Sequence, residues 1–169
     1  ILAMIVEFGN DEVYYWTYAM YPDWSHFDHP PMVGWLIQLF SCNLLFDSEF
    51  FLRLSSVIFM TINTYLVFLI GRQVKNEQTG FYAALLYTAS IYAFVITGIF
   101  ILPDTPLSIF TLLAVLQFVK YFQYDKNKHL LLAGLFTGLA MLSKYSGVFV
   151  WVGVGLYVII YARKEFKNP

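Results

Sequence analysis

The chain has 169 residues, of which 59% are hydrophobic, 20% are aromatic and only 12% are charged. A soluble globular protein carries about twice that share of charge, so the composition excludes an ordinary soluble domain and favours an all-α membrane protein that crosses the bilayer several times. The formal net charge of -1 discriminates little, and the single cysteine, Cys42, excludes an internal disulfide and a cysteine-based zinc site.

Several apolar segments approach the length of about 20 residues that a helix needs to cross a bilayer. Residues 1–8 are typical of the end of a first membrane helix, so we expect the chain to be the N-terminal part of a longer protein's membrane domain. Residues 50–71 and 80–102 predict two further spans. A fourth is predicted from Pro106 to about Phe122, because proline is tolerated where a helix begins.

The apolar stretch 129–162 is too long for one span. As a single helix it would measure about 51 Å, whereas the hydrocarbon core of a bilayer is about 30 Å thick. Lys144 lies near its middle, so we predict two shorter helices, 129–143 and 147–162, that meet there. Within the first of them the sequence GLFTG, residues 134–138, predicts helix packing through small residues.

The charges alternate between the two ends of these helices. Three connecting segments hold eight of the ten basic residues and are therefore predicted to face the cytoplasm: Arg72, Lys75, Lys120, Lys126, Lys128, Arg163, Lys164 and Lys167. The opposite face holds eight of the eleven acidic residues: Glu7, Asp11, Glu12, Asp23, Asp28, Asp47, Glu49 and Asp104. It also holds Arg53 and Lys144.

Residues 9–49 form a long external segment that is not a polar loop. Residues 12–21 are rich in tyrosine and tryptophan, which favour the membrane interface. Pro30 and Pro31 then open an apolar stretch that is too short to span comfortably. We therefore predict two helices that lie along the outer membrane surface.

Asp11 and Glu12 lie where the chain leaves the first membrane helix. Carboxylates at a lipid boundary are functional candidates, and partial desolvation makes a carboxylate a better general base. Alternatively, the pair only ends one helix and caps the next.

Three further groups could take part in a site. Asp23, His26, Asp28 and His29 could bind a divalent metal, or could form a hydrogen-bonded loop in which Asp28 or His29 caps the helix that Pro30 introduces. Asp104, in the turn PDTP, lies on the same side as Asp11 and could simply begin a helix.

Lys144 lies at the end of a short helix and must reach the interface, pair with an acid such as Asp104, or hold an anion such as a lipid phosphate. Arg53, near the outer start of its span, has the same interpretations.

In this order, the sequences NDEVYYW, WSHFDHPPMVGWLI, PDTPL and GLAMLSKYSG resemble the dolichyl-phosphate-mannose protein mannosyltransferase-like glycosyltransferases of the GT-C superfamily. The similarity is closest to the bacterial branch that includes the aminoarabinose transferase of lipid A. It covers essentially the whole chain, and the DE-x-YYW and FDHPP elements are its most specific parts.

The resemblance implies an inverting transfer of a sugar from a polyprenyl-phosphate donor to a lipid, glycan or protein hydroxyl. This would take place on the non-cytoplasmic face of the membrane, here the periplasmic side of a bacterial inner membrane. Asp11 matches the catalytic base and Glu12 the second acidic position. Lys144, with Arg53, is expected to bind the donor phosphate.

The residues expected to line the acceptor side of the site are Asp104, His26, Asp28, His29 and Tyr15. Whether Asp11, Asp104 and His29 bind a divalent metal is left open by the sequence. No other cofactor is expected. The sequence shows no nucleotide-binding domain and predicts no nucleic-acid partner. A membrane transporter or flippase is the main alternative, although the internal repeats typical of transporters are not evident. A second alternative is a non-catalytic membrane scaffold whose acidic residues are only interfacial.

Overall fold

The computed structural model describes residues 2–162, and among these residues every regular element is a helix. The order is α1 (Leu2–Ile5), α2 (Asn10–Met20), α3 (Met32–Phe40), α4 (Glu49–Val74), α5 (Glu77–Ala89), the π-turn η1 (Tyr92–Ile96), α6 (Asp104–Tyr124), α7 (Asn127–Ser143), the 3-10 turn η2 (Tyr145–Val148) and α8 (Phe149–Tyr161). The all-α fold class is thereby confirmed.

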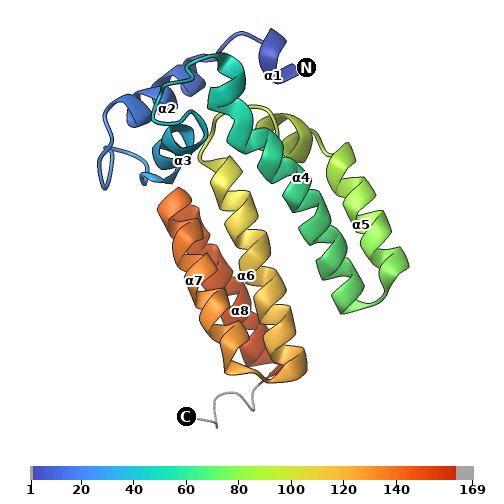
Figure 1. Ribbon diagram of the computed structural model, residues 1–169. Helices are drawn as coiled ribbons and strands as arrows, with labels where there is room; N and C mark the ends of the chain where they lie inside the picture. The colour runs from blue at the N-terminus through green and yellow to red at the C-terminus, as the bar shows by residue number, and fades with distance from the viewer. Residues whose placement is uncertain (1, 163–169) are drawn as a thin grey trace.

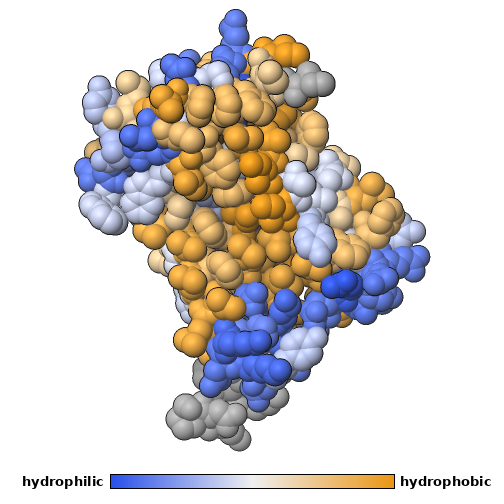
Figure 2. All heavy atoms as spheres, in the orientation of Figure 1, coloured by the Kyte–Doolittle hydropathy of each residue, from blue (hydrophilic) through white to orange (hydrophobic). Residues whose placement is uncertain are grey.

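The long helices run side by side, and α2 and α3 lie across the end of the bundle where α4 and α6 begin (Figure 1). In the described chain, α4 and α6 are long and apolar enough to cross a membrane. Apolar side chains cover the middle of the face drawn in Figure 2, and hydrophilic residues gather at its lower end. This distribution suits a bundle whose middle lies in lipid.

Glycines allow the closest helix contacts. A Cβ on Gly34 of α3 would lie 2.8 Å from Cβ of Tyr18 on α2, and a Cβ on Gly71 of α4 would lie 2.8 Å from Cα of Gly80 on α5. Gly34 therefore lets α3 pack directly on the backbone of α2. The core beneath these two helices is formed by Tyr15, Tyr18, Ala19, Val33, Ile37, Leu52 and Ile101.

One helix over residues 80–102 was expected, and the structure corrects this. Helix α5 ends at Ala89, a π-turn follows, and residues 97–103 are irregular. Side chains from other elements satisfy part of the backbone here: the carbonyl of Phe100 accepts from Ser56 Oγ at 2.9 Å, and the carbonyl of Thr97 accepts from Thr105 Oγ1 at 3.2 Å. The N–H of Ile101 reaches Glu12 on α2.

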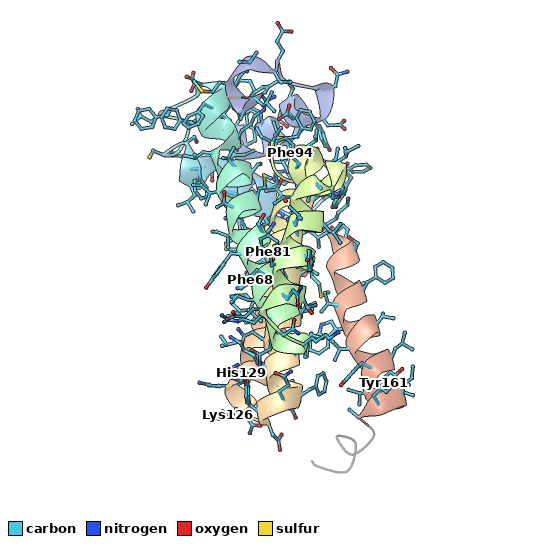
Figure 3. The ribbon with its side chains drawn as sticks, turned by 90° about the vertical axis from the view of Figure 1, so that its right-hand side faces the viewer. Phe68, Phe81, Phe94, Lys126, His129 and Tyr161 are labelled. Atoms are coloured by element: carbon cyan, nitrogen blue, oxygen red, sulfur yellow. The ribbon has the colours of Figure 1, made fainter. Side chains whose placement is uncertain are left out.

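The break predicted at Lys144 coincides with the end of α7 at Ser143. Lys144 itself is extended, with φ −156° and ψ 138°, and the chain resumes in η2 and α8. The basic residues Lys126 and His129 lie at the opposite end of the bundle from Phe94 (Figure 3). Of the residues predicted for the cytoplasmic face, Arg163, Lys164 and Lys167 lie outside the described part of the chain.

The packing role expected for GLFTG is not found among the described residues. A Cβ on Gly134 or Gly138 would meet no atom within 4 Å. These two glycines therefore face open space instead of a neighbouring helix.

Candidate functional site

The first turn of α2 presents its two acidic residues in opposite ways. Asp11 is exposed, and its carboxylate has no hydrogen-bond partner among residues 2–162. Glu12 is only 2% exposed, and its Oε2 accepts the N–H of Gly9 at 3.1 Å, which closes the start of the helix. The backbone thus fixes Glu12 inside and leaves Asp11 facing outwards.

Glu12 is held by Arg53 of α4, which is fully buried. The guanidinium donates to both oxygens of the carboxylate, from Nε to Oε1 at 2.8 Å and from Nη2 to Oε2 at 2.6 Å. Oε1 also accepts the N–H of Ile101 at 3.0 Å. A bidentate pair of this kind fixes both partners in orientation as well as in position.

The remaining donors of Arg53 go to the chain just before α2. Nη1 donates to the carbonyls of Ala3 and Val6 at 3.2 and 2.5 Å, and Nη2 donates to that of Glu7 at 3.3 Å. With the two bonds to Glu12, all five N–H donors of a guanidinium are engaged. We call Glu12 and Arg53 the buried clamp, and it joins α1, α2, α4 and the segment before α6. This arrangement leaves no donor of Arg53 for a lipid phosphate.

Lys144 and Asp104 are in contact at the end of the bundle where α2 and α3 lie. Lys144 Nζ lies 2.9 Å from Oδ2 and 3.2 Å from Oδ1 of Asp104, and their side chains are 34% and 19% exposed. Tyr92, on the π-turn, donates its hydroxyl to Asp104 Oδ1 at 2.8 Å. Sequence reasoning had no signal for Tyr92, because its place depends on the break after α5.

Tyr15 connects these groups. Its ring is buried, and burial raises the pKa of its phenol to about 12, with further contributions from the nearby negative charges of Asp28, Asp11 and Asp104. Three of the aspartates predicted for the site therefore act on one buried phenol, although they lie as much as 93 positions apart in the chain. The structure brings Asp11, Tyr15, Asp28 and Asp104 into one neighbourhood.

Asp28 fastens the loop between α2 and α3. Its Oδ1 accepts hydroxyl hydrogen bonds from Tyr18 at 2.6 Å and from Tyr14 at 2.7 Å, and these bonds hold the pKa of the carboxyl below its usual range. The ring of His26 stacks on that of Tyr18 at 3.6 Å, and the ring of His29 lies 5.5 Å from that of Tyr15. The i and i+4 spacing of the two tyrosines was the signal that could have revealed this contact.

The metal alternative finds no assembled ligand set in the part of the chain that the structure describes. No three His, Cys, Asp or Glu residues are close enough together to hold an ion. Asp28 receives two phenolic hydrogens, and Asp104 faces an ammonium group. Those contacts engage Oδ1 of Asp28 and both carboxylate oxygens of Asp104.

Comparison with known proteins adds two findings. The profile of the family described as dolichyl-phosphate-mannose-protein mannosyltransferase matches residues 28–169. The chain is also 28% identical over 165 residues to the lipid A galacturonosyltransferase RgtD of Rhizobium johnstonii (strain DSM 114642 / LMG 32736 / 3841), a match that covers 96% of this chain and 34% of the relative. The chain thus spans about a third of that protein's length. No solved structure matches.

Proposed function

Because the chain belongs to the dolichyl-phosphate-mannose-protein mannosyltransferase family, we propose that it forms the N-terminal part of a membrane glycosyltransferase. The enzyme takes a sugar from a polyprenyl phosphate and transfers it, with inversion, to a hydroxyl of a lipid, glycan or protein. The observation that carries this proposal is geometric: Glu12, next to the exposed Asp11, accepts the N–H of Ile101, three residues before Asp104, and Asp104 in turn pairs with Lys144.

The chemistry needs two charges of opposite sign. The Asp11 carboxylate takes the proton from the acceptor hydroxyl as its oxygen attacks the anomeric carbon. The bond from that carbon to the phosphate oxygen breaks, and the phosphate leaves with the electron pair. Lys144 stabilises the negative charge of the leaving phosphate. One base suffices for inversion, because no covalent sugar–enzyme intermediate forms.

Asp11 acts as the base in this proposal because it is the exposed member of the acidic pair. The buried clamp fixes the first turn of α2, on which Asp11 lies, relative to Ile101 and hence to Asp104. Lys144 takes the phosphate-binding role, since the donors of Arg53 are already engaged. In this proposal Asp104, His26, Asp28 and His29 line the acceptor side, where the ring of Tyr15 lies 5.5 Å from that of His29.

The side of the membrane follows from the charges. Lys75 and Lys126 lie in the connections between α4 and α5 and between α6 and α7, and Arg72 and Lys128 lie in the adjoining helix turns, at the end opposite α2 and α3. The positive-inside rule favours a cytoplasmic position for these connections. The site then faces the periplasm of a bacterial inner membrane, with α2 and α3 along its surface.

The test is a transfer assay with the full-length protein, a set of polyprenyl-phosphate sugars and extracted envelope lipids and proteins as acceptors. We expect transfer from at least one such donor with inversion of the anomeric configuration. A product of retained configuration would contradict the single-base mechanism. Transport of a sugar lipid without transfer would favour the flippase alternative.

The role of Lys144 is tested in the same assay. Lys144→Gln removes the charge that faces the phosphate, and we expect the apparent KM for the donor to rise by about tenfold or more, which corresponds to about 1.4 kcal/mol. Lys144→Arg keeps the charge and should recover part of the loss. An unchanged KM in Lys144→Gln would count against a phosphate contact.

A further inference from the structure

A groove runs between α7 and the loop that joins α2 to α3, with a volume of about 620 Å³. In Figure 1 that loop lies beside the upper end of α7. The lining of the groove includes Trp24, Ser25, Pro31, Gly134, Gly138 and Tyr145. We call it the α7 groove. No step of the reaction proposed above uses it.

The floor of the α7 groove is made by two glycines. Gly134 and Gly138 are four residues apart and therefore lie on the same face of α7. A Cβ on either would meet no protein atom within 4 Å. Glycine within a helix costs about 1 kcal/mol relative to alanine, and no close helix contact in the described chain offsets that cost here. The missing side chains keep the groove deep.

The chemistry of the walls points to an amphiphile. Between Gly134 and Leu142 all lining side chains are apolar, and polar side-chain atoms come only from Ser25, Trp24 and Tyr145. Tyr145 follows Lys144 directly in the chain, and the Lys144 side chain is 34% exposed while its Nζ pairs with Asp104. An anionic head at the outer end of the α7 groove would share this ammonium with Asp104, so the groove suits a ligand with an apolar chain and an anionic head.

The size of the groove favours a chain over a helix. From Gly134 to its end at Ser143, α7 rises about 14 Å at 1.5 Å per residue. A volume of about 620 Å³ spread over that length gives a cross-section of roughly 45 Å², or a width of about 7.5 Å. A helix with its side chains is about 10–12 Å across. A single branched hydrocarbon chain fits this width.

We infer that the α7 groove holds the first isoprene units of the donor's tail, with the phosphate at Lys144. This inference rests on the proposed function for the identity of the ligand. It places the tail on α7, beneath the loop that carries His26 and Asp28, and leaves the outer side of Asp11 open to the acceptor. The tail's position then orients the anomeric carbon between Asp11 and Lys144.

A second, larger groove of about 750 Å³ lies between α6 and α8 and is the competing location. It extends from Leu107, near the outer end of α6, to Gln123, near its basic inner end. Its α8 wall includes Gly153. Glycine variants can therefore compare the two grooves directly.

The test uses the full-length protein and a sugar-free polyprenyl phosphate that carries a photoreactive diazirine in its first isoprene units. In the wild type we expect cross-links in the peptide 134–145. Gly138→Leu fills the α7 groove and should lower cross-linking by about tenfold. Gly155→Leu is the matched control, because Gly155 is also a helical glycine with no atom within 4 Å of an added Cβ and lines neither groove.

Each outcome decides the inference. Cross-links in 149–161, or a loss in Gly153→Leu in place of Gly138→Leu, would move the tail to the groove between α6 and α8. If the wild type shows no cross-link in 134–145, and Gly138→Leu gives the same cross-linking as Gly155→Leu, another protein segment covers the α7 groove. The wild-type cross-link site decides the question even if Gly138→Leu does not fold.

The transfer assay distinguishes failure of the proposed function from failure of the inference about the α7 groove. If the proposed function is wrong, the wild type transfers no sugar from any polyprenyl-phosphate donor, whatever the cross-linking pattern. If the wild type transfers sugar and the tail lies elsewhere, only the inference about the α7 groove falls.

Discussion

Asp11 and Glu12 are neighbours in the sequence, but their side chains have different environments in the structure. Glu12 accepts hydrogen bonds from Gly9, Arg53 and Ile101, whereas Asp11 is exposed. The spacing of the pair could predict that both lie at a helix start. It could not predict which one is buried, because Arg53 and Ile101 lie 41 and 89 positions away. The pairing is a tertiary effect.

Glu12→Gln tests whether Glu12 supports the site or takes part in the chemistry. Removing one partner of a buried ion pair costs about 3–5 kcal/mol, because the other charge stays buried without compensation. We expect a clearly lower thermal midpoint for the full-length protein in detergent, with Glu7→Gln, an exposed neighbour, as control. Loss of transfer at an unchanged midpoint would assign Glu12 a chemical role.

The contact of Asp28 with Tyr14 and Tyr18 predicts a pH dependence. Because the folded pKa of Asp28 is lowered, its contribution to stability is present above its unfolded pKa of about 3.9 and is lost as the pH falls through the folded value. We expect the thermal midpoint of the wild type to fall more steeply below about pH 4 than that of Tyr18→Phe. Parallel curves for the two proteins would rule out this contribution.

At the scale of elements, the helix ends that were predicted well are those that the chain sets locally. Lys144 interrupts a stretch that is too long for one span, and α7 ends beside it at Ser143. The segment 80–102 was predicted poorly because Ser56, Thr105 and Glu12 satisfy its backbone from other elements. No periodicity in the segment itself reports those bonds.

The contact between α2 and α3 gives a test of packing. Gly34→Ala would bring a methyl group to within 2.8–2.9 Å of Tyr18, so we expect the two helices to separate and the thermal midpoint to fall. Gly155→Ala is the matched control, because alanine there enters open space and gains helix propensity of up to about 1 kcal/mol. Equal midpoints for the two variants would argue against close packing of α2 on α3.

At the scale of the whole molecule, the fold places the basic connections and the candidate functional site at opposite ends of the bundle. The basic connections lie at one end, and the acidic groups with Lys144 lie at the other, under α2 and α3. Composition and charge were enough to predict this polarity and the all-α class. The pairing of Lys144 with Asp104 was among the sequence-based interpretations of that lysine. The hydrogen bond from Tyr92 to Asp104 could not be predicted, since it needs α6 and the π-turn to be in place.

The most direct measurement is the transfer rate of Asp11→Asn in the full-length protein, compared with Asp47→Asn, a second exposed aspartate in the same external segment. A general base contributes about 10²–10⁴-fold to a rate. We predict a fall in kcat of about 100-fold or more for Asp11→Asn, with normal membrane abundance and donor cross-linking, and no change for Asp47→Asn. A kcat for Asp11→Asn equal to that of the wild type would contradict the assignment of Asp11 as the base.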